Sequence, residues 1–595
     1  MKPMKTVPVR SVLCLCFLGL GAIGLAGTLS EKGRTFDNDQ ATVWWAHSCV
    51  KVFPNDSPPT QRAQAAPLFA ARGETDAVQV VLRPKQAMAG LAAIVSDFDG
   101  PAKLPASIAM ARWVAYVPVR QASGLRGGTG QFPDPLPLRA PTNISAGQNQ
   151  PAWITVRVPV SAKPGDYRAQ VTFTANGAKL CEVPLALHVW RFELPPTALE
   201  VMASARAGLR PQKDGGSPEE VYHRYVRNMS DHGVNTLGAH VLRPGQGWKQ
   251  HDDEIAFLKS VGIRNFVMDL GWVKHERHRW PADAQWEMRN VFAAMGTLTR
   301  DSPRALRIAD ATGNDFDPKF RETFSGLVRQ FTQHYQQLGI LERSFVRFID
   351  EPLLEDQRTV DWIARVSKLI KDTAPSLRIL HTRAPIPALM PLTDIWETHT
   401  DLWGPPYGEN IEAARQAGAE IWVYHNSIPL IDYPLMRVRT FAWALWKNRV
   451  TGTGAWWDLT AWTMTGQNPW EDTLYGPWNG GGVLLYPPRD KDEQGPIDSI
   501  RWEVWRDSLE DHRLLELTAS LAKKHPDNVE LKQLLAEADT VCPTWPGVRD
   551  LSTEPYWDDA VKLESLRHRL AEAAEKLVAE TAVATPSRPA LGNQP

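Results

Sequence analysis

The chain has 595 residues, which is too many for a single hydrophobic core, so two or three domains are expected. Its charges almost cancel, with 66 Lys and Arg against 67 Asp and Glu and a net charge of −1. A nucleic-acid-binding protein would carry a basic surplus, so the composition argues against nucleic acid as a partner.

The first 26 residues are typical of a secretory signal. Lys2, Lys5 and Arg10 precede an apolar run over 12–25, which is short for a membrane span and ends in small residues. We therefore expect an exported protein, periplasmic or secreted, with cleavage after Ala26. An uncleaved N-terminal anchor is the alternative, and it would be the only contact with a membrane.

Three cysteines remain after that segment, namely Cys49, Cys181 and Cys542. They lack the spacing of metal ligands, and their odd number permits at most one disulfide within the mature chain. The pair to test is Cys49 with Cys181.

Residues 35–196 show the pattern of an all-β domain. Apolar residues alternate or cluster in the runs 77–82, 153–158, 167–173 and 185–190, and turn signals such as Asn176-Gly177 separate the runs. This spacing predicts a β-sandwich. No reactive constellation stands out in it, so support or substrate presentation is its expected role.

From 197 to 490 strands alternate with longer helical segments, which favours a parallel sheet with crossover helices. The number of strands matches a (β/α)8 TIM-type barrel. Asp317 and Pro318 are a good start for a helix over 319–338. The long connection 273–315 is expected to be an insertion with some helix that could overhang the pocket. The candidate strands are 200–204, 233–237, 264–269, 344–350, 378–381, 394–397, 420–424 and 454–457.

The remainder, 491–582, is expected to be helical, with helices over 499–524, 527–539 and 558–582. Residues 583–595 are rich in Pro, Ala and small polar types, which predicts a disordered tail.

Two adjacent carboxylates end the apolar run 344–350, because Asp350 is followed by Glu351 and Pro352. In a parallel barrel the end of such a strand lies at the C-terminal rim, where barrel enzymes carry out their chemistry. Two acids that share a site of low dielectric are not easily ionised together. One could then stay protonated and donate a proton, while the other stays negatively charged. The alternative is a solvated turn in which Asp350 caps the next helix.

Other polar and aromatic residues also follow predicted strands, including Glu397 and His399. If the barrel closes, they meet around one mouth, where hydroxyl-binding groups and flat rings suit sugar recognition. For each one alone, a structural role at the strand end is the alternative, and core packing equally explains the 24 Trp. The predicted substrate-binding residues are Tyr424, Asn426, Trp403, Trp456, Trp457, His381 and Asp269.

Other chemistries find less support. The chain has no G-x-S-x-G, no phosphate-binding Gly-rich loop with Lys, and no H-E-x-x-H. His399 with Asp401, or His381 with Glu397, could bind a metal, but such pairs arise often by chance. No metal or other cofactor is predicted.

A family resemblance rests on seven segments in order: 348–352, 394–396, 418–424, 439–443, 452–457, 482–487 and 499–511. As a set, the chain resembles glycoside hydrolase family 123 and the related bacterial domain of unknown function 4091. The resemblance covers the second half of the barrel and the first C-terminal helix. Ser508 and His512 depart from the family pattern, which usually has Gly and Tyr there.

The resemblance implies retaining hydrolysis of β-linked N-acetylhexosamines, N-acetylgalactosamine in particular, assisted by the acetamide of the substrate. Glu351 would be the general acid and base, and Asp350 would orient the acetamide. Adjacent acids on one strand end cannot easily flank a sugar from opposite faces, so a nucleophile within the substrate agrees with the residues.

Two functions therefore stand as hypotheses. The first is an exported glycosidase that acts on a glycan with Asp350 and Glu351 as its catalytic pair. The second is a non-catalytic carbohydrate-binding or envelope protein on the same fold. The acid pair favours the enzyme, because binding alone needs no proton donor.

Overall fold

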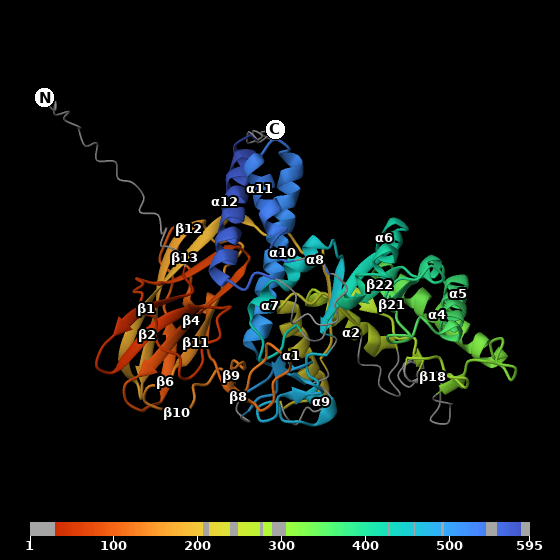
Figure 1. Ribbon diagram of the computed structural model, residues 1–595, viewed down its shortest axis with the longest axis horizontal. Helices are drawn as coiled ribbons and strands as arrows, with labels where there is room; N and C mark the ends of the chain where they lie inside the picture. The colour runs from red at the N-terminus through yellow and green to blue at the C-terminus, as the bar shows by residue number, and fades with distance from the viewer. Residues whose placement is uncertain are drawn as a thin grey trace, which may run out of the picture.

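The computed structural model describes residues 30–205, 214–238, 248–273, 278–287, 305–425, 428–456, 458–489, 493–542, 545 and 556–584. The expected signal segment and the residues after 584 lie outside these ranges. The chain forms a β-rich N-terminal part, a barrel, and a set of long C-terminal helices that stands between the two (Figure 1).

The N-terminal part contains the predicted β-sandwich. Side chains from both main sheets, such as Val80 and Phe173, share one buried core. One sheet has the order β1 (Lys32–Asp37), β2 (Ala41–His47), β4 (Thr75–Pro84), β11 (Gln150–Arg157), β7 (Ala109–Trp113). The other has the order β3 (Ala66–Arg72), β13 (Ala178–Glu193), β12 (Gly165–Ala175), β6 (Leu91–Val95). Short pairs join β5 (Met88–Ala89) to β10 (Asn143–Ile144) and β8 (Tyr116–Val119) to β9 (Gly130–Pro133).

Eight parallel strands then close into a barrel, which confirms the predicted fold class. Every strand expected from the sequence is present within a few residues. In order they are β14 (Glu200–Ala203), β15 (Thr236–Gly238), β16 (Asn265–Val267), β20 (Ser344–Val346), β21 (Arg378–Thr382), β22 (Ile395–His399), β23 (Glu420–Tyr424) and β24 (Gly452–Trp456).

Helices connect the strands of the barrel. The fourth strand is preceded by a helix that begins as predicted, because the Asp317 carboxylate accepts hydrogen bonds from the backbone N–H groups of Lys319 and Phe320. The helices are α1 (Pro218–Asp231), α2 (Trp248–Ser260), α4 (Pro318–Gln337), α5 (Gln357–Thr373), α6 (Gly408–Gln416), α7 (Met436–Arg439) and α8 (Phe441–Lys447). Short 3-10 turns are η1 (Ala106–Ile108), η4 (Leu341–Arg343), η5 (Met390–Leu392) and η6 (Thr400–Leu402).

The inside of the barrel is layered. Side chains of neighbouring strands, including Leu380, Ile395 and Trp422, form an apolar cluster of their own. Alternate residues of a strand face the same side, so the residues two positions further along also face inward, nearer the C-terminal rim. These are Thr382, Glu397 and Tyr424. The strand pattern therefore places polar groups directly above an apolar floor.

The expected helix within the insertion 273–315 stays a prediction, because much of this segment lies outside the described residues. Its described part forms a three-stranded antiparallel sheet of β17 (Trp272–Val273), β18 (Gln285–Glu287) and β19 (Ala305–Arg307), whereas 288–304 lies outside the described residues. The insertion contacts the loop after β20, because Val273 N–H donates to the Phe348 carbonyl at 2.8 Å and Leu353 N–H donates to the His278 carbonyl at 2.6 Å. It thus flanks the loop that carries the acid pair.

The C-terminal region begins with small elements and ends in long helices. α10 is buried along most of its length and joins the parts of the molecule, because its Glu503 pairs with Arg112 of the sandwich and its Asp511 pairs with Arg439 of α7. The elements are α9 (Trp462–Thr465), β25 (Leu474–Tyr475), β26 (Trp478–Asn479), β27 (Leu485–Tyr486), β28 (Ile497–Asp498), α10 (Ile500–Lys524), α11 (Val529–Ala538) and α12 (Ala560–Ala584).

The cysteines correct one expectation. Cys49, Cys181 and Cys542 are all free and buried. Cys181 lies in the core of the sandwich, whereas Cys49 belongs to the large core that continues into the barrel and the helices. The suggested Cys49–Cys181 disulfide is therefore wrong, because the two side chains pack into different cores.

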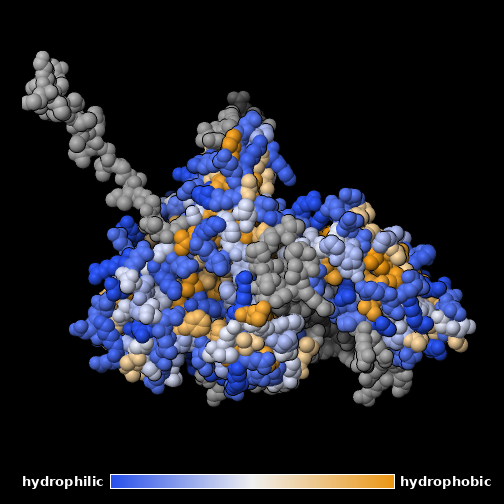
Figure 2. Space-filling view, in the orientation of Figure 1, coloured by the Kyte–Doolittle hydropathy of each residue, from blue (hydrophilic) through white to orange (hydrophobic). Residues whose placement is uncertain are grey.

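Hydrophilic residues cover most of the face seen in Figure 2, and hydrophobic residues form only small groups there. None of the helices that the structure describes combines the length and apolar character needed to cross a membrane. Among the largest fully buried side chains, nine are Trp, so core packing accounts for much of the Trp content.

Candidate active site

Asp350 and Glu351 follow β20 at the C-terminal rim of the barrel. Glu351 has a φ of +38°, a left-handed conformation that costs a non-glycine residue about 1–3 kcal/mol and is concentrated at functional sites. Its backbone is held by the neighbouring strand, because Glu351 N–H donates to the Thr382 hydroxyl at 2.7 Å. The backbone of Glu351 is thus held in this conformation by a contact with β21.

The two carboxylates have different partners. Asp350 forms an ion pair with the Arg347 guanidinium, which lies 5.2 Å from the centre of the Trp272 ring. Glu351 instead accepts a hydrogen bond from the Tyr424 hydroxyl. The pair is therefore chemically unequal, since one acid faces a cation and the other faces a neutral donor.

Tyr424 stays protonated in this arrangement. Burial raises the pKa of its hydroxyl, and the nearby Glu351 carboxylate raises it further. The side chain is only 4% exposed. Of the residues predicted to bind substrate, Tyr424 is the one that the described contacts join directly to the acid pair, and it orients Glu351.

A third acid lies at the same end of the barrel. Glu397 of β22 is fully buried, and among the described residues neither of its side-chain oxygens has a hydrogen-bond partner. Burial raises its pKa from 4.5 to about 8, with Asp350 and Glu351 adding to the rise and Arg347 opposing it. This carboxyl is consequently protonated near neutral pH, as an acid in an apolar site can be.

Glu397 is among the polar residues expected around the barrel mouth, but it is not one of the predicted catalytic or substrate-binding residues. The signal that could have found it is strand alternation, because Glu397 lies two residues after Ile395 of the apolar layer. Its burial without a partner could not be read from the sequence.

The expected placement of His381 at the mouth is corrected. Its imidazole forms a 3.1 Å hydrogen bond with Ser367 of α5 and packs near Phe348 and Trp396, and it is 1% exposed. His381 precedes the inward-facing Thr382 by one residue, so it faces the helices instead. Burial lowers the pKa of this imidazole to about 3, which keeps it neutral.

The other predicted binding residues are placed as follows. Asp269 accepts a hydrogen bond from Gly271 N–H at 3.0 Å, which stabilises its own turn. Trp403 donates to the Thr398 hydroxyl at 3.0 Å and packs against Trp545, with ring centres 5.0 Å apart. Neither contact joins them to Asp350 or Glu351. Trp456 lies on β24, and its side chain, like Asn426 and Trp457, lies outside what the structure describes.

Of the two metal-binding pairs considered from the sequence, one is separated and the other is in direct contact. His381 and Glu397 face opposite sides of the barrel wall, as the contacts of His381 and the layering of the barrel indicate. The Nδ1 atom of His399 lies 2.5 Å from the Asp401 carboxylate. That pair forms a local cap at the start of η6.

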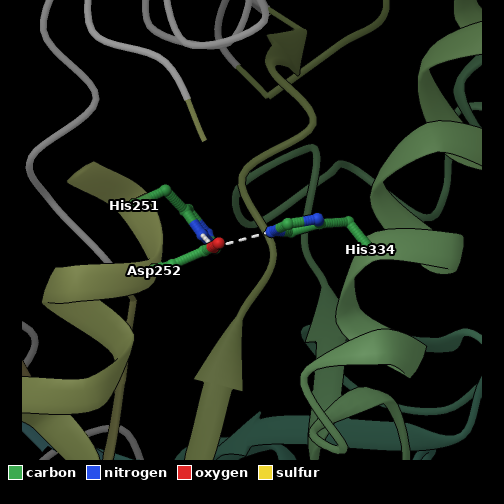
Figure 3. A group of neighbouring side chains, drawn as sticks. All are labelled: His251, Asp252 and His334. Atoms are coloured by element: carbon green, nitrogen blue, oxygen red, sulfur yellow. Dashed lines mark hydrogen bonds and ion pairs between the residues drawn. The ribbon is translucent and has the colours of Figure 1, made fainter. Parts of the chain in front are cut away.

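A different cluster has the composition of a metal site. His251 and Asp252 of α2 converge on His334 of α4 (Figure 3), with the Asp252 carboxylate 2.6 Å from His334 and 3.2 Å from His251. His251 also contacts the Tyr335 hydroxyl at 3.1 Å. Because these residues lie on two helices and satisfy one another by hydrogen bonds, they link the helices, and none of these contacts involves Asp350 or Glu351.

We expect excess EDTA to leave turnover unchanged, because Asp350 is paired with Arg347, Glu351 is bonded to Tyr424, and the buried Glu397 carboxyl is protonated near neutral pH. The measurement is the hydrolysis rate of a chromogenic glycoside before and after dialysis against the chelator. A loss of rate that is restored by Zn²⁺ or Mn²⁺ would contradict the arrangement.

Two hollows in the described residues lie away from the barrel mouth. One, of about 490 Å³, is lined by sandwich residues such as Trp113 and Arg139. The other, of about 420 Å³, lies between the sandwich, α10 and residues such as Thr197 and Gly233, which precede barrel strands. That is the N-terminal side of the barrel, opposite the rim at which barrel enzymes work. The acid pair is therefore the better candidate for chemistry.

Comparisons with known proteins agree with this geometry. Residues 263–518 match the family described as "Glycoside hydrolase 123, catalytic domain", and residues 50–175 match "Glycoside hydrolase 123 N-terminal domain". Together these matches cover more than half of the chain. No curated protein matches the chain.

Solved structures extend the comparison of the fold. A family 123 glycoside hydrolase from Clostridium perfringens has 13% sequence identity and a TM-score of 0.65, covering 92% of this chain and 100% of its own. A family 39 glycoside hydrolase from Bacteroides cellulosilyticus WH2 has 10% identity and a TM-score of 0.33, covering 74% of this chain and 81% of its own. The first likeness spans both the sandwich and the barrel.

Proposed function

Because the chain belongs to glycoside hydrolase family 123, we propose that it is an exported, retaining β-N-acetylhexosaminidase that prefers N-acetylgalactosamine. That it is a glycoside hydrolase follows from its family. The sugar, the stereochemistry, the site residues and the export are the proposal. The observation that carries it is the unequal acid pair at the end of β20.

The position of the pair favours a nucleophile within the substrate. In other retaining glycosidases two carboxyl groups about 5–5.5 Å apart act from opposite faces of the sugar, one as nucleophile and one as acid. Asp350 and Glu351 are adjacent in the chain and come from one strand end, which does not suit opposite faces. A 2-acetamido group can supply the nucleophile instead.

In the first step Glu351, in its protonated form, gives its proton to the glycosidic oxygen. The acetamide carbonyl oxygen attacks C1 as the bond from C1 to that oxygen breaks, and the aglycone leaves as an alcohol. Asp350, which is paired with Arg347, accepts a hydrogen bond from the acetamide N–H and stabilises the positive charge of the oxazolinium-like intermediate.

In the second step Glu351, now a carboxylate, takes a proton from water as the water oxygen attacks C1. The bond from C1 to the acetamide oxygen breaks, which restores the acetamide and the protonated acid. Two inversions at C1 give net retention. Tyr424 serves both steps by holding Glu351 through its hydroxyl.

The nature of the substrate follows from this mechanism. It needs a β-linked sugar with a 2-acetamido group, and such sugars occur in glycans of many kinds. The Clostridium perfringens family member is described in connection with glycolipid glycan hydrolysis. We include glycolipid glycans among the substrates to test, and direct contacts from Asn426, Trp403, Trp456 and Trp457 stay predictions.

The experiment compares nitrophenyl β-glycosides that differ at C2. The acetamido sugars, first the galacto and then the gluco form, are expected to be hydrolysed with the β-anomer formed first, as followed by NMR. The corresponding 2-hydroxy sugars are expected to react at least about 100-fold more slowly, because they lack the nucleophile. Similar rates on both classes would contradict substrate assistance, and binding without hydrolysis of any of them would favour the carbohydrate-binding alternative.

Export rests on residues 1–26, which have the composition of a secretory signal. Expression of the full chain in a bacterial host should give a protein that leaves the cytoplasm and begins at or near Gly27. A mature protein that keeps Met1 and stays in the cytoplasmic fraction would contradict this part.

A further inference from the structure

Glu397 occupies a defined place in the barrel interior. On β22 it pairs in register with Thr382 of β21 and Trp422 of β23. Ile395, two residues earlier, belongs to the apolar layer, so the carboxyl stands on that layer and faces the C-terminal end. Thr382 also holds the backbone of Glu351, which brings Glu397 within two strands of the acid pair.

Among the residues that the structure describes, the backbone of Glu397 is hydrogen-bonded, whereas its side chain is not. Its backbone carbonyl accepts a hydrogen bond from Arg383 N–H at 3.0 Å. Its side chain is different, because among the described residues it is the carboxylate whose two oxygens are both buried without a hydrogen-bond partner. A buried polar group left in this way is destabilising, so its retention calls for a function.

Other buried acids in this protein show how unusual that is. Asp511 lies between Arg439 and Arg567, and Asp134 forms two hydrogen bonds with Arg501. These carboxylates are held by cations in fixed positions. These two structural acids are thus paired with cations, whereas the buried carboxyl of Glu397 has no hydrogen-bond partner among the described residues.

The charged groups around Glu397 come from three elements. Arg347, Asp350 and Glu351 belong to the loop after β20, and their charges act on Glu397. Tyr424 of β23 lies close enough to Glu397 that a charge on Glu397 would raise the pKa of the Tyr424 hydroxyl. This hydroxyl, however, donates its hydrogen bond to Glu351. The residue after β21 that bonds the Glu397 carbonyl is Arg383, which has a left-handed φ of +83°.

We propose that Glu397 binds a hydroxyl group of the sugar whose glycosidic bond is cleaved, and so determines which sugar is accepted. This inference rests on the proposed function for the identity of the ligand. A protonated carboxyl has one donor and one acceptor, and a hydroxyl has both as well, so the two pair in both directions. The sugar satisfies the buried oxygens that the protein leaves without partners.

Two substitutions separate binding from packing. Glu397→Gln keeps one donor and one acceptor of similar shape, whereas Glu397→Leu keeps the volume and removes the hydrogen bonds. Glu510→Gln is the matched control, since burial raises the pKa of Glu510 to about 8 as well, but Glu510 bonds Thr75 N–H at the contact between α10 and the sandwich. Each variant is measured for kcat/KM, for its melting temperature, and for affinity toward free N-acetylgalactosamine by calorimetry.

We expect Glu397→Leu to lower kcat/KM and the affinity for the free sugar at least about tenfold, while its melting temperature stays equal to that of the parent or rises. Glu397→Gln should retain activity within about threefold at pH 6. The parent should lose activity as the pH rises through about 8, where Glu397 ionises, and the Gln variant should lose less. Glu510→Gln should leave kcat/KM and sugar affinity unchanged.

The same ionisation gives a readout without substrate. The pKa of Glu397 is raised in the folded state, so its contribution to stability is full below 4.5 and is lost as the pH rises to about 8. The melting temperature of the parent should therefore fall more between pH 5 and pH 8 than that of Glu397→Gln. If the Leu variant does not fold, the role of Glu397 is tested by this comparison of melting temperatures and by the pH dependence of activity in the Gln variant.

The outcomes distinguish this inference from the proposed function. Unchanged sugar affinity and kcat/KM in Glu397→Leu, with the parent active, would overturn the role of Glu397 and leave the hydrolase intact. Sugar binding that depends on Glu397 in a parent without turnover would support the inference and remove the catalytic proposal. A Leu variant that melts far below the parent, together with a Gln variant whose pH profile matches the parent, would show a structural role only.

Discussion

Replacing Glu351 by Gln is expected to lower kcat toward a nitrophenyl β-N-acetylgalactosaminide by about 10²–10⁴-fold, because the variant can neither protonate the glycosidic oxygen nor activate water. Gln can still accept the hydrogen bond from the Tyr424 hydroxyl, so the local structure should persist. The decrease should be larger for a substrate with an alkyl alcohol as leaving group, since a poor leaving group depends more on the proton donor.

Asp350→Asn should also lower kcat at least about 100-fold, through loss of the negative charge that faces the acetamide. Glu412→Gln is the control, since that carboxylate lies on α6 with a side chain that is 43% exposed. Melting temperatures close to that of the parent would show that the two active-site variants are folded. Equal rates for the parent, Asp350→Asn and Glu351→Gln would remove the acid pair from the mechanism.

The largest effect on stability is expected at Arg501. Its side chain is fully buried and donates to both oxygens of Asp134 at 2.7 Å, and to the backbone carbonyls of Pro429, Gly480 and Val483. Arg501→Met would leave the buried Asp134 without its cation. Breaking such a pair typically costs about 3–5 kcal/mol in the free energy of unfolding. Denaturant unfolding of both proteins provides the measurement.

An exposed pair provides the comparison for Arg501. Lys249 and Asp253 are 2.6 Å apart, with side chains 87% and 64% exposed, so Lys249→Met should cost less than about 1 kcal/mol. Adding Asp134→Leu to Arg501→Met should recover part of the loss, because the uncompensated charge is then gone. An effect of Arg501→Met no larger than that of Lys249→Met would contradict the expected role of the buried pair.

These buried ion pairs also explain one part of the resemblance to the family. The segment 499–511 lies on α10, where Arg501, Glu503 and Asp511 hold the sandwich, the barrel and α12 together. The segment therefore marks packing between domains. Ser508, a departure from the family pattern, is accommodated because its hydroxyl donates to the Arg439 carbonyl at 2.7 Å and accepts from Ala442 N–H at 3.1 Å.

The fold could be predicted because buried parallel strands have a simple pattern. The runs 344–350 and 420–424 are apolar and β-branched or aromatic, and they end in polar residues at the rim. The insertion was harder, because short antiparallel strands such as β18 and β19 have only three residues each and little periodicity. The side chains of Cys49 and Cys181 pack into separate cores, and their spacing in the sequence gives no indication of this.

The site could be predicted only in part. Asp350 and Glu351 were found because two acids that end a buried strand are conspicuous. His381 and Thr382 differ by one position, so a small uncertainty in strand alternation decides which of them faces the barrel. Glu397 follows the apolar run of its strand as the acids follow theirs, but its importance depends on burial without a partner, which is a property of the folded chain.

The most direct test of the central claim is a crystal structure of Glu351→Gln with an intact β-N-acetylgalactosaminide bound. We predict that residue 351 lies about 2.6–3.2 Å from the glycosidic oxygen, that the Asp350 carboxylate accepts from the acetamide N–H, and that the acetamide oxygen points at C1. A sugar bound away from the end of β20, or one whose acetamide faces away from Asp350, would contradict the account.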